Sequence, residues 1–363
     1  MAGNKNLNDA AKAKKDEFYT QIEDIERELN HEEYQNFFKG KTVLCNCDDP
    51  YESEFFKYFA MNFNALEIKK LIVTCYAGSP VAQTELNFDE GGALDKKHRN
   101  EYAYKVIINE LKDWNGDGRE DLKDIKQYIL THNGCWERLK GNGDFRSAEC
   151  IELLKEADVV VTNPPFSLFR EYVAQLMQYD KKFVILGNKN AITYKEIFPL
   201  IQKNKMFVGY TPMSKEVYFH VPQKYIDAGL AENKDRTIVK VAGEYVSRSA
   251  SIWYTNIPLK KHNEELLLVC SYYENPEKYP RYDNYDAIEV SKTAMIPYDY
   301  IDNRGVVMGV PITFLDKYNP EQFEIVGCTY QYGDCGCHVK GTSWGAKING
   351  KDIYKRLFIR RKM

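Results

Sequence analysis

The sequence predicts an α/β fold built around a doubly wound, parallel β-sheet. Two observations lead to this prediction. Short apolar runs alternate with helical stretches through about the first 220 residues, the pattern of chains that form parallel sheets. Several runs, including residues 159–162 (VVVT) and 183–187 (FVILG), are apolar on both faces, as a sheet covered by helices on both sides requires.

The predicted elements alternate along the chain. Residues 20–38 are expected to form one amphipathic helix, because Ile22, Ile25 and Leu29 recur at helical spacing. From about residue 222 the chain is richer in Tyr, Pro and Asn, and strand-like alternation returns at residues 321–330 and 350–363. Between residues 38 and 222, strands are expected at residues 41–45, 71–75, 158–162, 183–187 and 206–209, and helices at residues 53–62, 102–111, 122–128, 168–179 and 194–204.

The overall charge does not single out a nucleic-acid-binding protein. Lys and Arg number 50 against 53 Asp and Glu, a net charge of −3, so basic charge for such a role has to be local. The last 13 residues do concentrate basic side chains, which fits either a cationic binding surface or a solvated terminal strand. This C-terminal basic cluster comprises Lys351, Lys355, Arg356, Arg360, Arg361 and Lys362.

The cysteines and the N-terminus indicate the compartment. Nine cysteines, an odd number, without a signal peptide predict reduced thiols in the cytoplasm. The close pairs Cys45–Cys47 and Cys335–Cys337 lack the usual spacing of zinc ligands, so a zinc site is not favoured. Since no run of about 18 apolar residues occurs, we expect a soluble protein without a membrane span.

The segment with the clearest chemical meaning is VVVTNPPF, in which an apolar strand runs directly into Asn163, Pro164, Pro165 and Phe166. The exocyclic amine of adenine is a poor nucleophile because its lone pair is conjugated with the ring. The Asn163 amide oxygen and the Pro164 carbonyl can each accept one N–H of that amine, which frees the lone pair for attack on a methyl group. The prolines stiffen the loop.

The position of this loop supports a catalytic interpretation. It follows the carboxyl end of a strand, where open α/β sheets bind their ligands. Phe166 offers a flat face on which a base turned out of the duplex can stack. The same arrangement also suits methylation of other amines and of amides, so the motif alone does not identify DNA as the substrate.

Longer segments resemble the EcoRI-type DNA adenine-N6 modification methyltransferases. The resemblance is carried by residues 14–30, 43–59, 143–176 and 183–201, with further matches at 251–257 and 352–361. It implies a Rossmann-like methyltransferase sheet, S-adenosyl-L-methionine as methyl donor and double-stranded DNA as substrate. We therefore expect a flexible tail at residues 1–15, a catalytic core at 16–220, and a region at 221–363 that joins the remaining core strands to a smaller DNA-recognition region.

The resemblance also implies which residues bind the methionine part of the donor. Phe18, Tyr19 and Thr20 match a segment that packs over this part, although a hydrophobic staple before the first helix gives the same pattern. The first strand is followed by a loop that lacks the glycines usual in relatives. Asn46, Asp48 and Asp49 in that loop are candidates, with either carboxylate suited to the donor's amino group.

The adenine part of the donor is assigned to Asp144 and Phe145, whose matched segment accepts from the adenine amine and packs on the ring. Asp144 is alternatively a helix N-cap. The second strand lacks the acidic residue that grips the ribose in many relatives, and Tyr76 is a candidate to cover the adenine ring instead.

A second aromatic face for the target base is expected on the far side of the pocket. Trp253 and Tyr254 are the favoured candidates, with Phe219 as a third. Taken singly, each of these residues is more typical of the hydrophobic core than of a binding site.

Residues 113–124 (DWNGDGREDLKD) have the spacing of an EF-hand-like calcium loop. A polar turn between two helices explains the same sequence. Any bound ion would be structural, because methyl transfer from a sulfonium requires no metal. The positions concerned are Asp113, Asn115, Asp117, Arg119, Asp121 and Asp124.

These observations lead to one principal hypothesis, a sequence-specific DNA adenine methyltransferase that acts as a monomer. We expect it to belong to a restriction–modification system, in which a cognate restriction enzyme would not bind it physically. The alternatives are a methyltransferase acting on RNA or on a protein glutamine, and an inactive relative that only binds DNA. The NPPF residues Asn163 to Phe166 are all present, which argues against the inactive relative.

Overall fold

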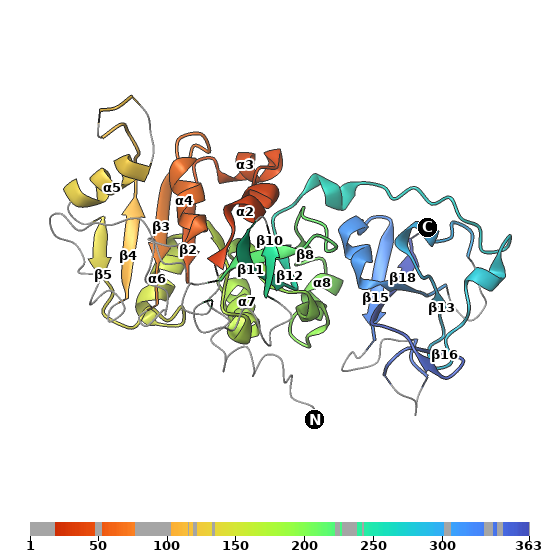
Figure 1. Cartoon of the computed structure of the whole chain (residues 1–363). Coiled ribbons are helices and arrows are strands. Elements are labelled where there is room, and N and C mark those ends of the chain that lie inside the picture. The colour runs from red at the N-terminus through yellow and green to blue at the C-terminus, as the bar shows by residue number, and fades with distance from the viewer. Residues whose placement is uncertain are drawn as a thin grey trace. The chain divides into compact units, whose positions relative to one another are not determined.

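The computed structural model describes residues 19–47, 53–76, 103–114, 116–118, 122–132, 135–221, 226, 238–241, 243–300, 306–329, 337–339 and 344–362. Two compact units make up the chain (Figure 1). Unit 1 comprises Met1–Asn188 and Lys215–Ile257, and unit 2 comprises Lys189–Ser214 and Pro258–Met363. The helices within the described ranges include none long and apolar enough to cross a bilayer.

The centre of unit 1 is a parallel sheet in the order β3-β2-β6-β7, formed by β2 (Thr42–Asn46), β3 (Lys70–Thr74), β6 (Val159–Thr162) and β7 (Lys182–Asn188). Every residue of β2 and β6 is buried, as the two-sided apolar pattern predicted. The parallel strands are thus confirmed as the core of a mixed α/β sheet consistent with a Rossmann-like methyltransferase.

The edges of this sheet differ from the prediction because they are antiparallel. β4 (Tyr104–Ile108) pairs with β3, β5 (Trp136–Arg138) with β4, and β12 (Ser251–Thr255) with β7. The helix expected at residues 102–111 is wrong, since this segment is β4. Tyr104, Val106 and Ile108 are buried and alternate with half-buried neighbours, a period of two that the apolar content of the segment concealed.

The helices of unit 1 confirm most of the predicted positions. The single helix expected at residues 20–38 is instead α2 (Ile22–Leu29) and α3 (Glu32–Phe38), because His31 takes an extended conformation between them. Ser53 and Ser147 cap the next helices by accepting backbone N–H bonds. These and the remaining helices are α4 (Glu54–Met61), α5 (Leu122–Thr131), α6 (Ala148–Glu156) and α7 (Phe169–Gln178).

A second, antiparallel sheet of unit 1 has the order β1-β9-β11-β10. It consists of β1 (Tyr19–Thr20), β9 (Val217–His220), β10 (Ile238–Val241) and β11 (Glu244–Ser249). Asp24 of α2 joins the helix to this sheet by accepting the backbone N–H of Tyr218 at 2.9 Å. Burial raises the pKa of the Asp24 carboxyl, although this hydrogen bond and Arg27 oppose the change.

Unit 2 contains a sheet in the order β13-β14-β18-β15. The strands are β13 (Ile288–Glu289), β14 (Met308–Pro311), β15 (Phe323–Cys328) and β18 (Arg356–Arg361). The strands expected near residues 321–330 and 350–363 are confirmed, whereas the helix at 194–204 shortens to α8 (Phe198–Gln202). The recognition role expected for residues after 220 stays a prediction.

Smaller elements are β8 (Phe207–Val208), β16 (Lys347–Ile348), β17 (Lys351–Asp352) and the 3₁₀ turns η4 (Lys189–Thr193), η5 (Lys260–Asn263), η6 (Pro276–Lys278), η7 (Thr293–Met295) and η8 (Ile312–Lys317).

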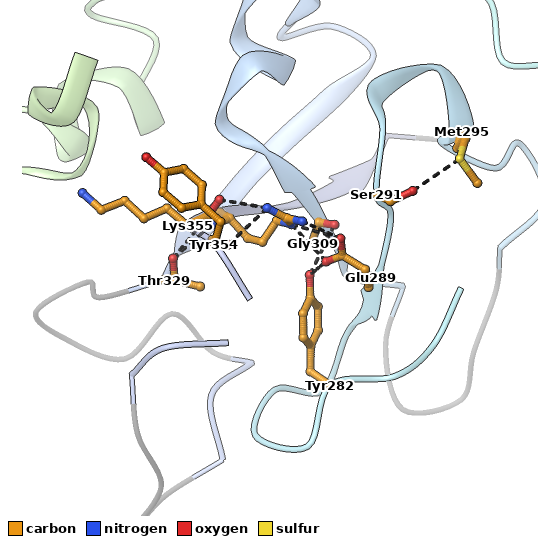
Figure 2. A network of polar contacts seen from close by, with 9 residues as sticks. Tyr282, Glu289, Ser291, Met295, Gly309, Thr329, Tyr354 and Lys355 are labelled. Atoms are coloured by element: carbon orange, nitrogen blue, oxygen red, sulfur yellow. Dashed lines mark hydrogen bonds and ion pairs between the residues drawn. The ribbon is translucent and has the colours of Figure 1, made fainter. Parts of the chain in front are cut away.

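A buried polar network holds the strands of this sheet together (Figure 2). Arg356 Nη2 lies 2.7 Å from Glu289 Oε1, and its Nε donates to both carboxylate oxygens at 3.1 and 3.0 Å. The Tyr282 hydroxyl donates to the same carboxylate. A Cβ atom at position 309 would lie 2.2 Å from this hydroxyl oxygen, so only glycine fits there. The network therefore specifies how β13, β14 and β18 pack.

Candidate active site

The carboxyl ends of β2 and β6 meet at the point where the strand order reverses. The chain leaves β2 toward β3 on one side and later returns to β6 on the other side of β2. Open α/β sheets bind ligands at such a point because the loops diverge there and leave a crevice. The Thr162 hydroxyl donates to the Asn46 carbonyl, which joins the two strand ends.

The loop that follows β6 presents an unpaired hydrogen-bond acceptor. Asn163 Oδ1 is buried and has no hydrogen-bond partner within the described part of the chain. An unsatisfied buried polar atom costs about 1–3 kcal/mol, so its retention indicates a site for a ligand donor. The Pro165 carbonyl is already used, because it accepts the Leu168 N–H at 3.0 Å at the start of the 3₁₀ turn η3 (Phe166–Leu168).

The segment predicted to contact the cofactor lies beside this loop through β1 and β9. Thr20 is paired with Phe219 across the two strands, and the Phe219 ring lies 6.1 Å from the Phe166 ring at 41°. Thr20 Oγ1 is a second buried polar atom that no described residue hydrogen-bonds. Thr20 is thus connected to the NPPF loop through Phe219, while Tyr19 belongs to β1 and Phe18 lies outside the described residues.

The loop after β2 keeps the backbone of a glycine turn without the glycine. Cys47 has a φ of 68°, the left-handed conformation that glycine adopts most readily. Asn46 is buried just before it, and its side-chain oxygen accepts the hydroxyl of Tyr172 on α7. Asp48 and Asp49 lie outside the described residues, so their predicted contact with the donor stays a prediction.

The turn containing Asp144 is built around an ion pair. Arg146 contacts Asp144 through Nε at 2.9 Å and Nη2 at 2.7 Å, and it also reaches Glu171 of α7 at 2.8 Å. The Arg146 hydrogen bond lowers the pKa of the Asp144 carboxyl, because it stabilises the charged form. The alternative that Asp144 caps a helix is wrong, because Ser147 caps α6.

The same turn lies close to the end of β3. A Cβ atom at Gly143 would be 2.1 Å from the Cys75 carbonyl oxygen, which leaves no room for a side chain. Gly143 also has a φ of 77°, a backbone conformation that favours glycine. Phe145 is buried against Tyr172 with ring centroids 5.0 Å apart. Its predicted packing on the cofactor stays a prediction.

The aromatic residues favoured for stacking on the target base are buried in the core of unit 1. Trp253 meets Phe55 edge-on at 5.9 Å. Tyr254 donates its hydroxyl to the Asn188 carbonyl at 3.0 Å and packs on Phe169. Both rings are at most 1% exposed, and their stacking role stays a prediction.

Two residues that sequence reasoning did not select belong to this site. Thr74 ends β3 beside Asn46, and its buried hydroxyl has no partner among the described residues. The absence of an acidic residue at this strand end was the available signal. Tyr172 gave no signal, because only the folded chain brings α7 to the loop after β2.

The calcium-like loop is described only in part, since Asn115, Arg119 and Asp121 lie outside the described residues. The Asp113 carboxylate accepts the backbone N–H groups of Gly116 and Gly118, each at 2.7 Å, which is a polar turn. Asp124 is buried in α5, and Asp117 lies 3.9 Å from Lys123. Calcium binding stays a prediction.

The C-terminal basic cluster is largely engaged within unit 2. Arg356 pairs with buried Glu289, Arg360 with Glu324 at 3.1 Å, and Arg361 with the Tyr298 carbonyl. Lys355 donates to the Thr193 hydroxyl at 3.1 Å, and burial lowers the pKa of its ammonium group. These partners favour a structural strand over a free cationic surface at these four positions.

Comparisons with known proteins identify the family of this chain. Residues 6–362 match the family described as adenine-specific methyltransferase EcoRI. The chain belongs to this family. Its curated relatives include the Type II methyltransferase M.EcoRI of Escherichia coli, 44% identical over 361 residues that cover 99% of this chain and 98% of the relative.

Two further relatives are mycoplasmal Type II methyltransferases. The Mycoplasma genitalium protein is 36% identical over 363 residues, covering 98% of both chains. M.MpnI of Mycoplasma pneumoniae is 37% identical over 324 residues, covering 89% of this chain and 85% of the relative. No solved structure matches. Family membership confirms the predicted enzyme class, an adenine-specific DNA methyltransferase.

Proposed function

We propose that this chain transfers a methyl group from S-adenosyl-L-methionine to the N6 amine of an adenine turned out of double-stranded DNA, at a specific sequence. The observation that carries the proposal is the buried Asn163 Oδ1 just after the carboxyl end of β6, which none of the described residues hydrogen-bonds. An adenine amine has two N–H donors, and one of them would supply the hydrogen bond that this oxygen lacks among the described residues. The family match supports the proposal, since its description names adenine.

The chain's own residues orient the amine. Asn163 Oδ1 and the Pro164 carbonyl each accept one N–H, which turns the nitrogen lone pair toward the methyl group. Phe166 is partly exposed at the start of η3 and supplies a stacking face worth about 1–3 kcal/mol. A base within a duplex cannot reach such a loop, so the adenine has to leave the stack.

The residues around the strand ends fit the methyl donor. The hydroxyls of Thr20 and Thr74, which lack partners among the described residues, would donate to its polar atoms, and Asn46 lies beside Thr74 at the end of β2. The ionised Asp144 carboxylate would accept from its adenine amine. When bound, S-adenosyl-L-methionine supplies a methyl group on a positively charged sulfur, which departs as a neutral thioether without further activation.

DNA is held through its phosphates, so its affinity falls with salt. We assign sequence recognition to residues that follow position 220, in line with the expected recognition region, and a monomeric enzyme suffices for this reaction. A restriction enzyme of the same specificity would act on the same sequence without binding this chain.

The test is incubation of the purified protein with unmethylated genomic DNA and S-adenosyl-L-methionine labelled in the methyl group. The products are digested to nucleosides, and modified positions are mapped by single-molecule sequencing. Label in N6-methyladenine at one recurring sequence supports the proposal. Label only in RNA or protein moves the activity to another substrate, and cofactor binding without any transfer indicates an inactive DNA-binding relative.

A further inference from the structure

We infer that Tyr172 is a positioning residue for the methyl donor, acting through the carboxamide of Asn46. The inference rests on the proposed function, because it concerns the affinity of the same site for S-adenosyl-L-methionine. It adds a residue on helix α7 that makes no direct contact with the reacting atoms.

Asn46 is held from two directions by elements adjoining the catalytic loop. The buried Tyr172 hydroxyl donates to its side-chain oxygen, and the Thr162 hydroxyl donates to its backbone carbonyl. Thr162 directly precedes Asn163, and α7 starts three residues after Phe166. Any shift of α7 is therefore transmitted to the end of β2.

The face of α7 that carries Tyr172 also holds the Asp144 turn. Gln175, one turn further along the helix, donates to the Phe145 carbonyl at 3.1 Å. The Tyr172 ring meets the Phe145 ring edge-on, at an angle of 73°. Glu171 contacts Arg146, the partner of Asp144. One helix thus supports two of the segments that are proposed to bind the donor, the end of β2 and the Asp144 turn.

The chemical consequence concerns the two branches of the Asn46 carboxamide. One branch is an acceptor and the other carries two N–H donors. A tyrosine hydroxyl that donates to the oxygen places the N–H groups on the opposite branch. The methionine part of the donor bears a carboxylate, which N–H groups bind and a carbonyl oxygen would repel. Without the hydroxyl, the buried oxygen loses its partner and the two orientations of the amide become closer in energy.

The test compares Tyr172→Phe with Tyr34→Phe in the full-length enzyme. Tyr34 is a matched control because it is also fully buried in unit 1 and donates its hydroxyl to a buried acceptor, Glu28, at 2.8 Å. Both variants should lose thermal stability. Only Tyr172→Phe should raise the KM for S-adenosyl-L-methionine and the Kd for S-adenosylhomocysteine, by about tenfold, with kcat at saturating cofactor within about threefold of wild type.

A second variant tests whether Tyr172 acts through Asn46. Asn46→Ala should raise the same KM, and adding Tyr172→Phe to it should raise the KM no further. An unchanged KM in Tyr172→Phe overturns the inference, as does an equal rise in Tyr34→Phe or full additivity with Asn46→Ala. If any of these contradicting results occurs while the wild-type enzyme binds and uses the cofactor, only the inference about Tyr172 is overturned and the proposed function stands. If the wild-type enzyme binds no cofactor, both the inference and the proposed function are wrong.

Discussion

Thr20 lies directly opposite Phe219 in the pairing of β1 with β9, and Phe219 in turn packs against Phe166 of the NPPF loop. Segments from the beginning, middle and later part of unit 1 thereby meet at one place. The rings of Phe219 and Phe166 are tilted by 41° with centroids 6.1 Å apart, a separation typical of packed aromatic pairs. Phe219 is therefore expected to support the stacking face that Phe166 presents to the target adenine.

Phe219→Leu should loosen this support and lower kcat/KM by about tenfold, within the range of lost stacking energy. A DNA duplex with 2-aminopurine at the target position should show a smaller fluorescence increase on binding this variant. Phe59→Leu is the control, because Phe59 is likewise buried in unit 1 and packs on Phe38, which has no predicted role in the site. A loss of activity per folded molecule in both variants would show that the effect is one of general packing.

Asn163→Ala should lower kcat by about 100-fold or more, the range for losing a group that assists proton and charge movement in a transition state. Its side-chain oxygen has no partner to lose among the described residues, so stability should be unchanged or slightly raised. Calorimetry should give a Kd for S-adenosylhomocysteine within about threefold of wild type. Equal losses of binding and turnover would instead make Asn163 a structural residue.

Arg356→Met should lower the free energy of unfolding by about 3–5 kcal/mol, because it leaves the Glu289 charge buried without its partner. The two side chains are only 12% and 8% exposed. Urea unfolding of the variant and of Arg356→Met/Glu289→Leu provides the measurement, and the double variant should be less destabilised than the sum of the single changes.

Lys351→Ala is the control for this prediction, since Lys351 belongs to the same basic cluster and is exposed on β17. It should leave stability within about 0.5 kcal/mol of wild type. If Arg356→Met unfolds like wild type but binds DNA much more weakly, Arg356 belongs to the DNA interface and its structural assignment is wrong.

His262 should make unit 2 less stable in acid. Burial lowers the pKa of its imidazole to about 4, with the nearby Lys261 charge acting in the same direction. In the unfolded chain the imidazole takes up a proton near pH 6.5, whereas in the folded chain it does so only near pH 4. The contribution of neutral His262 to the free energy of unfolding is therefore fully present above pH 6.5 and is lost as the pH falls from 6.5 toward 4. A shift of this size corresponds to about 3 kcal/mol.

The measurement is the free energy of unfolding at pH 7.5 and at pH 5, for wild type and His262→Gln. The variant should lose less stability between the two values, while His31→Gln, which alters an exposed histidine, should follow wild type. A parallel pH dependence in wild type and His262→Gln would contradict a buried, neutral imidazole.

The sequence by itself determined the enzyme class and the central parallel strands, and it located the NPPF loop at the end of one of them. Their signals are local: VVVT is apolar at every position because both faces of β6 are buried, and Asn163 to Phe166 follow it without interruption. Local patterns did not determine the strand at 104–108, where alternation of burial depends on which neighbours the segment meets.

Only the tertiary structure decided which buried polar groups are hydrogen-bonded and which have no partner within the described residues. Arg356 and Arg360 look alike in the C-terminal sequence, yet one lies in a buried ion pair and the other in an exposed one. Tyr172 reaches Asn46 because α7 folds back over the sheet, and Asn163 Oδ1 lies where none of the described residues reaches it. Hydrogen bonds between residues distant in sequence depend on the arrangement of whole elements, which no local pattern encodes.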